Sequence, residues 1–193
     1  MTIYKTIKDT GVFEYKEKGS RFIASAFNIT DEQSALIKLN DLRKLHFKAN
    51  HVCFAYKTGF EKFTERASDD GEPSYTAGTP ILQQINKYEL TQVLVAVVRY
   101  FGGVKLGKGG LIRAYSTAAE NALLASDFID IEEHISYQFS VNFNFYNEIM
   151  DELKKLNAVI SNSSFEKECN FEISITKSKL IQLEILLNKT KRM

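Results

Sequence analysis

The chain has 193 residues and a formal net charge of +1, with the apolar and charged fractions of an ordinary globular protein. This length suits one large domain or two small ones, and the near-zero charge excludes a histone-like protein that binds nucleic acid over its whole surface. No stretch approaches the roughly 18–20 apolar residues that span a bilayer, and the N-terminus carries no export signal. Cys53 and Cys169 lie far apart, outside any Cys-x-x-Cys unit. We therefore expect a cytoplasmic protein with two free thiols, no membrane association and no cofactor.

The first part of the chain predicts strands and one helix. Residues 3–18, 21–28 and 51–56 indicate strands. Before the helix, Thr30-Asp31-Glu32-Gln33 fits a capping box in which the Thr30 hydroxyl and the Gln33 amide satisfy backbone amides at the helix start. The helix has apolar residues at helical spacing, which are Ala35, Leu36, Leu39, Leu42 and Leu45.

The middle of the chain predicts a long loop followed by a helix, a buried strand and a second helix. Residues 57–75 are polar and rich in turn residues, which is typical of a functional or mobile loop. Residues 76–86 predict a short helix, and the apolar run 93–98 predicts a buried strand. Residues 111–124 predict a long helix.

The pattern changes near Glu133, where we expect a domain boundary. Residues 135–145 alternate between apolar and polar side chains, which predicts a half-buried strand, and residues 146–156 predict a helix. Two strands (158–165 and 169–175) and a closing helix (176–189) follow. This β-α-β-β-α order suggests a small ferredoxin-like domain whose last strand is missing or very short. We predict an α+β fold with domains 1–133 and 134–193.

The most informative stretch is 99–113, which connects the buried strand to the long helix. It contains four cations and no acid: Arg99, Lys105, Lys108 and Arg113. It also holds five of the ten glycines of the chain, which are Gly102, Gly103, Gly107, Gly109 and Gly110. Glycines allow tight turns and close packing of the backbone, and between a strand and a helix they also let backbone N–H groups bind an anion. Because cations accompany them, we favour a phosphate-binding loop formed by these nine residues.

Two known nucleotide-binding motifs fit this stretch only in part. Gly102-x-x-x-x-Gly107-Lys108 has most of a Walker A loop, but Gly109 stands where the magnesium-binding Ser or Thr belongs. The dinucleotide motif Gly-x-Gly-x-x-Gly fails because Ile112 occupies its third glycine position.

Other chemistry-bearing residues have weaker patterns. Asp69, Asp70 and Glu72 form an acidic loop of unknown role that could bind a hard cation, although such clusters are often solvated turns. His51-x-Cys53 places two side chains on one face of a strand, without the second pair that a metal site requires. We therefore predict no metal site and name no catalytic residue. Tyr75 is the best candidate for an exposed ring that stacks on a base, whereas Tyr100 and Phe101 are expected in the core.

Three stretches together resemble the IMPACT/YigZ family in its two-domain bacterial form. They are His51-Val-Cys-Phe-Ala-Tyr56, Ser68-Asp-Asp-Gly-Glu-Pro-Ser74 with Thr76-Ala-Gly78, and residues 98–115. The resemblance implies that the first domain is an α/β sandwich like the second domain of ribosomal protein S5. It also implies that the tail resembles a C-terminal domain of translocase elongation factors. Two positions depart from the family pattern, since Tyr75 replaces a glycine and Thr79 replaces a basic or larger residue.

The resemblance implies a setting in translation. Eukaryotic relatives regulate translation during amino-acid starvation by binding an activator of the initiation-factor kinase. Our first hypothesis is a regulatory protein that binds RNA or the ribosome through residues 99–113, with the ferredoxin-like tail as a second contact surface. The alternatives are a regulator that acts through a protein partner, and a metal-assisted enzyme acting on a phosphorylated small molecule. In the enzyme, the acidic loop would hold a divalent metal and the cationic loop would hold the phosphate.

Overall fold

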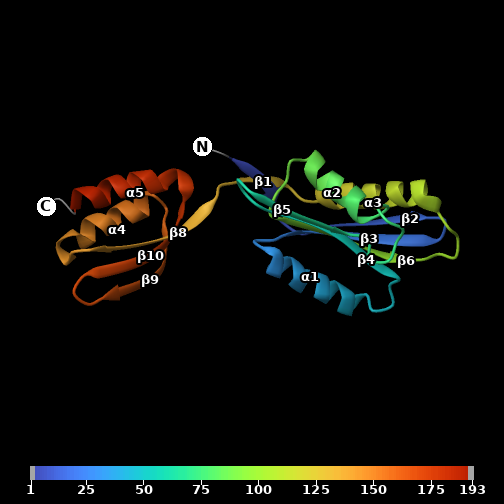
Figure 1. Ribbon diagram of the computed structural model, residues 1–193, viewed down its shortest axis with the longest axis horizontal. Helices are drawn as coiled ribbons and strands as arrows, with labels where there is room; N and C mark the ends of the chain where they lie inside the picture. The colour runs from blue at the N-terminus through green and yellow to red at the C-terminus, as the bar shows by residue number, and fades with distance from the viewer. Residues whose placement is uncertain (1–2, 191–193) are drawn as a thin grey trace. The chain divides into compact units, whose positions relative to one another are not determined.

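The computed structural model describes residues 3–190, which divide into two compact units, Tyr4–Ile131 and the chain from Glu132 onward (Figure 1). The predicted α+β class is confirmed, because both units combine helices with antiparallel sheets. None of the described helices is long and apolar enough to cross a membrane.

A five-stranded antiparallel sheet in the order β2-β3-β6-β4-β5 forms the centre of the first unit. Its strands are β2 (Gly11–Glu17), β3 (Ser20–Asn28), β4 (His51–Gly59), β5 (Phe63–Ser68) and β6 (Val93–Tyr100). The central strand β6 is buried from Val93 to Arg99, as its continuous apolar sequence predicts. Two short strands, β1 (Tyr4–Ile7) and β7 (Phe128–Ile131), pair separately as an antiparallel ribbon.

Helices cover both faces of this sheet. Helix α1 (Glu32–Leu45) lies on one face, and α2 (Gly78–Lys87) and α3 (Gly107–Leu124) lie on the other (Figure 1). Two apolar cores result, because alternate residues of β4 and β6 point to opposite faces: Val52 and Leu94 pack with α1, whereas Cys53 and Val95 pack with α2 and α3.

Two local predictions in this unit are wrong. The N-cap of α1 is Asp31, whose carboxylate accepts a hydrogen bond from the Ser34 backbone N–H, and Ser34 rather than Gln33 completes the capping box. The predicted loop 57–75 also contains two strand segments, since β4 continues to Gly59 and β5 pairs with it at the sheet edge. Because β5 is exposed on both faces, its sequence lacks the apolar alternation that identifies a strand.

The second unit has the predicted β-α-β-β-α order. Strands β8 (His134–Val141), β9 (Val159–Phe165) and β10 (Cys169–Thr176) form an antiparallel sheet in the order β8-β10-β9. Helices α4 (Tyr146–Lys155) and α5 (Lys177–Thr190) pack their apolar residues against it, and the short 3-10 helix η1 (Phe143–Phe145) ends the predicted strand 135–145 early. This strand order is that of a ferredoxin-like fold without its fourth strand in the described residues.

Candidate functional site

Helix α3 begins at Gly107, four residues before the expected start at Leu111. Gly107, Gly109 and Gly110 therefore belong to the first turn of the helix, and only Gly102 and Gly103 lie in the connection from β6. Glycine is a poor helix former, so its clustering suggests a loop. Packing of α3 against β2 and β3 outweighs that preference.

At most of these positions, the conformation or the close packing of the backbone requires a glycine. A Cβ atom at Gly102 would approach the carbonyl carbon of Gly19 to 1.9 Å, so close packing requires glycine there. Gly103 and Gly107 have φ values of +86° and +72°, which favour glycine. Gly109 differs, because its φ is ordinary and a Cβ would meet only the Arg113 side chain at 4.0 Å. Neither strain nor packing in the described structure requires a glycine at position 109.

The N-terminus of α3 has no side-chain cap. Its N-cap residue, Leu106, provides no hydrogen-bond acceptor, so the first backbone N–H groups of the helix are free of side-chain partners. Lys105, Lys108 and Arg113 are exposed beside it, and none of them forms an ion pair with another described residue. Helix dipole and cations together create a positive surface at this end of α3.

The acidic loop, by contrast, uses its charges within the protein. The Asp69 carboxylate accepts hydrogen bonds from the backbone N–H groups of Tyr75, Ala77 and Gly78, and so caps the start of α2. Burial acts to raise the pKa of Asp69, but these backbone hydrogen bonds outweigh it and lower the pKa.

The other two acids of the loop bind different partners. Asp70 accepts a hydrogen bond of 2.7 Å from the Val52 backbone N–H and pairs with Arg43 at 2.9 Å. Glu72 pairs with Arg99 and accepts a hydrogen bond of 2.7 Å from the Tyr115 hydroxyl. Within residues 3–190 no group of three or more acidic, His or Cys side chains could hold a metal ion. The metal-assisted alternative therefore has no assembled ligand set in the described acidic loop.

The Arg99–Glu72 pair joins the acidic and the glycine-rich stretches. Both side chains are almost fully buried, at 6% and 4% exposed, and the Arg99 guanidinium carbon lies 5.3 Å from the centroid of the Phe22 ring and 5.5 Å from that of Phe101. The Arg99 Nε is buried and has no hydrogen-bond partner among the described residues. The charge of Arg99, which the sequence suggests for phosphate binding, is thus compensated within the protein by Glu72.

Glu72, Arg99 and Phe101 line a pocket of about 440 Å³ between the acidic loop and the start of α3. Of the predicted site, it contains Arg99, Lys105, Gly107, Lys108 and Glu72. The lining does not include the other predicted residues, which are Gly102, Gly103, Gly109, Gly110, Arg113, Asp69, Asp70 and Tyr75. The remaining lining residues, which the sequence does not identify as site residues, are His51, Pro73, Phe101, Leu106 and Leu111. His51 has one signal in the sequence, since it shares a strand face with Cys53.

Two aromatic predictions have opposite outcomes. Tyr75 is 76% exposed, as expected, and has a φ of +65° in place of the glycine of the family pattern. The expectation that Phe101 lies in the core is wrong: it is 45% exposed because β6 ends at Tyr100 and the chain turns outward. Phe101 is thus a further ring available at the pocket.

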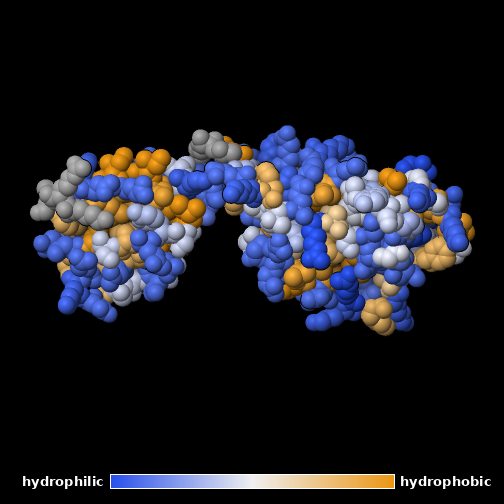
Figure 2. Space-filling model, viewed as in Figure 1, coloured by the Kyte–Doolittle hydropathy of each residue, from blue (hydrophilic) through white to orange (hydrophobic). Residues whose placement is uncertain are grey.

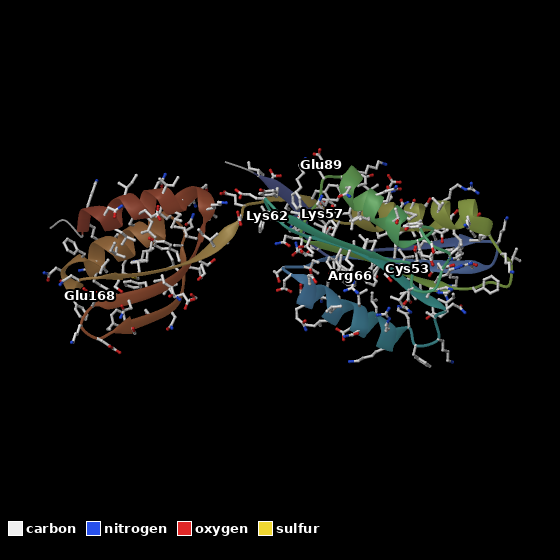
Figure 3. The ribbon with its side chains drawn as sticks, viewed as in Figure 1. Cys53, Lys57, Lys62, Arg66, Glu89 and Glu168 are labelled. Atoms are coloured by element: carbon white, nitrogen blue, oxygen red, sulfur yellow. The ribbon has the colours of Figure 1, made fainter. Side chains whose placement is uncertain are left out.

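Cys53 is not an activated nucleophile. Its side chain, in the interior of β4 (Figure 3), is fully buried, with Sγ 3.0 Å from the Asp69 carbonyl oxygen and 3.3 Å from the Tyr115 hydroxyl. Burial strongly raises the pKa of the Cys53 thiol, and it also raises the pKa of Tyr115. Both groups remain protonated near neutral pH and act as structural hydrogen-bond donors.

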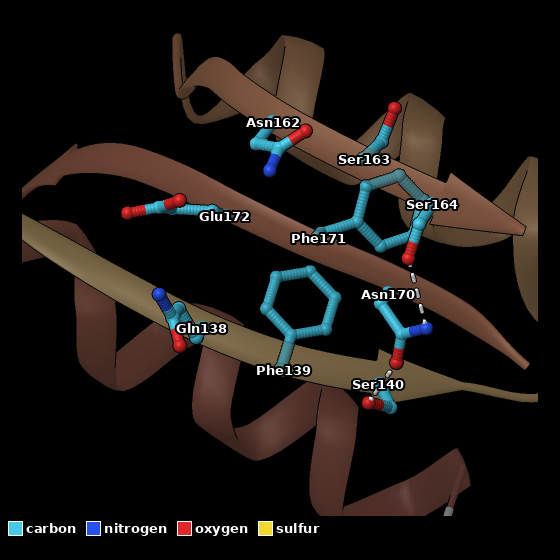
Figure 4. Close-up of a pocket in the computed structure, with 9 residues that line it drawn as sticks. All are labelled: Gln138, Phe139, Ser140, Asn162, Ser163, Ser164, Asn170, Phe171 and Glu172. Carbon is cyan, nitrogen blue, oxygen red and sulfur yellow. Dashed lines mark hydrogen bonds between the residues drawn. The ribbon is translucent and has the colours of Figure 1, made fainter.

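The second unit has a pocket of about 330 Å³ on the open face of its sheet (Figure 4). Its lining is polar and almost uncharged: Gln138, Phe139, Ser140, Asn162, Ser163, Ser164, Asn170, Phe171 and Glu172. It includes no Lys or Arg, so the lining of this pocket offers neither of these cations to a phosphate.

Comparison with known proteins finds a family match that lies within the first unit. The Impact N-terminal domain matches residues 18–123, which contain both the acidic loop and the start of α3. YvyE of Bacillus subtilis (strain 168), an IMPACT family member, is 34% identical over 169 residues, which cover 88% of this chain and 78% of that protein. Alignments with three further bacterial IMPACT family members span 53–66% of those proteins.

Solved structures include one that is similar over both units. The crystal structure of a hypothetical protein covers 100% of this chain and 94% of its own, at 26% identity and a TM-score of 0.79. Yih1, described as a two-domain translational regulator, covers 63% of this chain and 47% of its own at 29% identity, with a TM-score of 0.38. On the domain match and the similarity to YvyE, the chain belongs to the IMPACT family.

Proposed function

We propose that this protein is a translation-associated regulatory protein that binds RNA, ribosomal or transfer, through the N-terminal end of α3. The observation that carries the proposal is the uncapped start of an 18-residue helix beside three exposed cations without ion-pair partners in the described structure. Free backbone N–H groups, the helix dipole and neighbouring Lys and Arg side chains are the features that bind phosphate in proteins.

Helix α2 shows what such a helix start can do. There the Asp69 carboxylate accepts hydrogen bonds from the first backbone amides, so an anion from the same chain occupies the end of the helix. No carboxylate of the described residues caps α3 in this way, and Glu72, the acid of the pocket, is directed to Arg99 and Tyr115. An external anion, such as an RNA phosphate, fits this end of α3.

We assign the phosphate contacts to Lys105, Lys108 and Arg113, with Gly102, Gly103, Gly107, Gly109 and Gly110 allowing the backbone to approach. Arg99 holds the pocket in shape through Glu72. The balanced net charge favours binding at a local patch, and the lining of the pocket in the second unit has no Lys or Arg for a second phosphate contact. A cytoplasmic location is part of this proposal, in keeping with the two free, buried cysteines.

A regulator that acts through a protein partner is the second candidate. Helix α5 carries Ile181 and Ile185 at 64% and 55% exposure, and hydrophobic side chains gather on this helix in the surface view (Figure 2). Exposed apolar residues one helical turn apart are typical of a surface that binds another helix or sheet.

Binding of the purified protein to ribosomes and to bulk transfer RNA across a salt series tests the proposal. The variant Lys105→Ala/Lys108→Ala/Arg113→Ala should bind more weakly and show a flatter dependence of log affinity on log salt, by about 0.7 for each single-strand phosphate that is no longer neutralised. The matched control is Lys38→Ala/Lys44→Ala/Lys48→Ala, which removes three exposed cations near α1, on the opposite face of the sheet. Equal slopes for the two triple variants would refute the assignment to α3.

A further inference from the structure

His51 lines the pocket, and its Nε2 forms no hydrogen bond with a described residue. Its Nδ1 lies 2.8 Å from the backbone carbonyl oxygen of Asp70. A carbonyl oxygen only accepts hydrogen bonds, so Nδ1 carries the proton, and the Nε2 of the neutral ring is a hydrogen-bond acceptor. Nε2 forms no hydrogen bond with any described residue, and Glu72 Oε1 lies 4.0 Å from it.

Glu72 presents a second acceptor in the same place. Arg99, Tyr115 and His51 all approach one oxygen of its carboxylate, Oε1. The other oxygen, Oε2, has none of these contacts. Among the described residues, no donor forms a hydrogen bond with either His51 Nε2 or Glu72 Oε2, and a ligand with adjacent O–H groups would satisfy both acceptors.

The opposite wall has a different chemistry. Lys105 and Lys108 provide cations at the start of α3, and the apolar surface comes from Pro73, Phe101, Leu106 and Leu111. A volume of about 440 Å³ lies within the range of small-molecule sites and is large enough for a nucleotide.

We propose that this pocket holds one ribonucleotide unit of an RNA strand, recognised by its ribose hydroxyl groups. The hydroxyls donate hydrogen bonds to His51 Nε2 and Glu72 Oε2, the phosphate contacts Lys105 and Lys108, and the base packs against Phe101. This inference rests on the proposed function and deepens it, because it makes the site selective for RNA over DNA. The 2′-hydroxyl is the group that distinguishes the two, and carboxylates recognise ribose hydroxyls in other nucleotide sites.

Calorimetry with adenosine 5′-monophosphate, its 2′-deoxy analogue and inosine 5′-monophosphate tests the ribose assignment. The wild-type protein should bind the ribonucleotides about 5- to 10-fold more tightly than the deoxynucleotide, which is the effect of about one net hydrogen bond. Equal affinities for the ribo and deoxy forms would overturn the proposal. A loss of affinity with inosine 5′-monophosphate alone would overturn it too, because the donor would then be the amino group of the base.

Two variants separate recognition from folding. In His51→Asn the amide nitrogen can still donate to the Asp70 carbonyl, but the Nε2 acceptor is gone, so the preference for ribose should fall to within about twofold. Phe101→Ala, at a half-exposed position, should weaken the ribo and deoxy forms equally. A ribose preference that survives His51→Asn would refute the role of His51.

Hexamers of riboadenylate and deoxyadenylate connect the pocket to the proposed function. If transfer RNA binds with the predicted salt dependence but the two hexamers bind equally, the function stands and the ribose inference fails. If no transfer RNA or ribosome binds while the mononucleotides show the ribose preference, the proposed function fails and the pocket assignment stands. Absence of binding by every mononucleotide and hexamer would overturn the inference.

Discussion

The carboxylate of Asp69 accepts a hydrogen bond of 2.9 Å from the backbone N–H of Gly78, the first residue of α2. The same carboxylate holds the Tyr75 and Ala77 amides, so one side chain closes the loop between β5 and α2. Glu72 lies within that closed loop, and this placement directs it to Arg99. The geometry of the pocket thus depends on an acid that does not line it.

Replacement of Asp69 should destabilise the protein and change its acid sensitivity. In Asp69→Asn, one neutral amide oxygen replaces the two charged carboxylate oxygens as hydrogen-bond acceptor. The free energy of unfolding should therefore fall by about 1–3 kcal/mol at neutral pH. The folded pKa of Asp69 lies below its ordinary value of 3.8, so its contribution is present above that value and is lost as the pH falls through the lowered one.

Urea unfolding from neutral pH down to about pH 3 measures this dependence. The difference between wild type and Asp69→Asn should shrink as the pH falls. Asp41→Asn, at an exposed position on α1, is the control and should leave the pH profile unchanged. A constant difference across the range would show that the ionised carboxylate is not what stabilises the loop.

Gly109→Ala should separate stability from binding. A methyl group has open space at this position, and alanine favours helix, so we expect the free energy of unfolding to rise by about 0.5–1 kcal/mol. The same methyl group blocks approach of a phosphate to the backbone, so affinity for transfer RNA should fall about fivefold or more. Asn40→Ala on α1 is the matched control, which should stabilise its helix without changing RNA affinity. Unchanged binding by Gly109→Ala would exclude backbone contact there.

Tyr75 should report on both backbone strain and stacking. Tyr75→Gly relieves the strain of a non-glycine residue in the left-handed region, whereas the greater entropy of glycine in the unfolded state opposes folding. We expect the relief of strain to be larger, so the free energy of unfolding should rise by about 0.5–1 kcal/mol. If the ring stacks on a base, RNA affinity should fall about fivefold or more, because a stacked base contributes about 1–3 kcal/mol. Tyr75→Phe keeps the ring and should bind as the wild type does. Equal affinities for all three proteins would remove Tyr75 from the interface.

The cysteines should be unreactive in the folded protein. Both thiols are buried, and burial raises the pKa of Cys53, so a thiol-specific disulfide reagent at about pH 8 should react slowly with the native state and rapidly with both thiols after denaturation. Rapid labelling of native Cys53 would indicate that β4 and the acidic loop open readily, and would contradict the closure of this loop by Asp69.

The sequence by itself determined the elements with strong periodicity, and it identified residues 99–113 as the segment for which we propose phosphate binding. The apolar run of β6, the spacing in α1 and the alternation in β8 reflect which positions are buried. Because each buried position requires an apolar side chain, burial leaves a periodic pattern in the sequence. Prediction from the sequence failed where the local conformational preference of the residues conflicts with their packing in the fold. Gly107 to Gly110 discourage a helix yet start α3, and β5 lacks the apolar alternation of a half-buried strand.

Only the tertiary structure decided how the acidic and cationic stretches combine. Glu72 and Arg99 are 27 residues apart, and their contact depends on Asp69 closing one loop and on the pairing of β4 with β6. The orientation of the His51 ring likewise follows from a hydrogen bond to a backbone carbonyl, which any residue at position 70 provides. Such contacts leave no pattern in residue type, because they depend on where the folded backbone places its atoms.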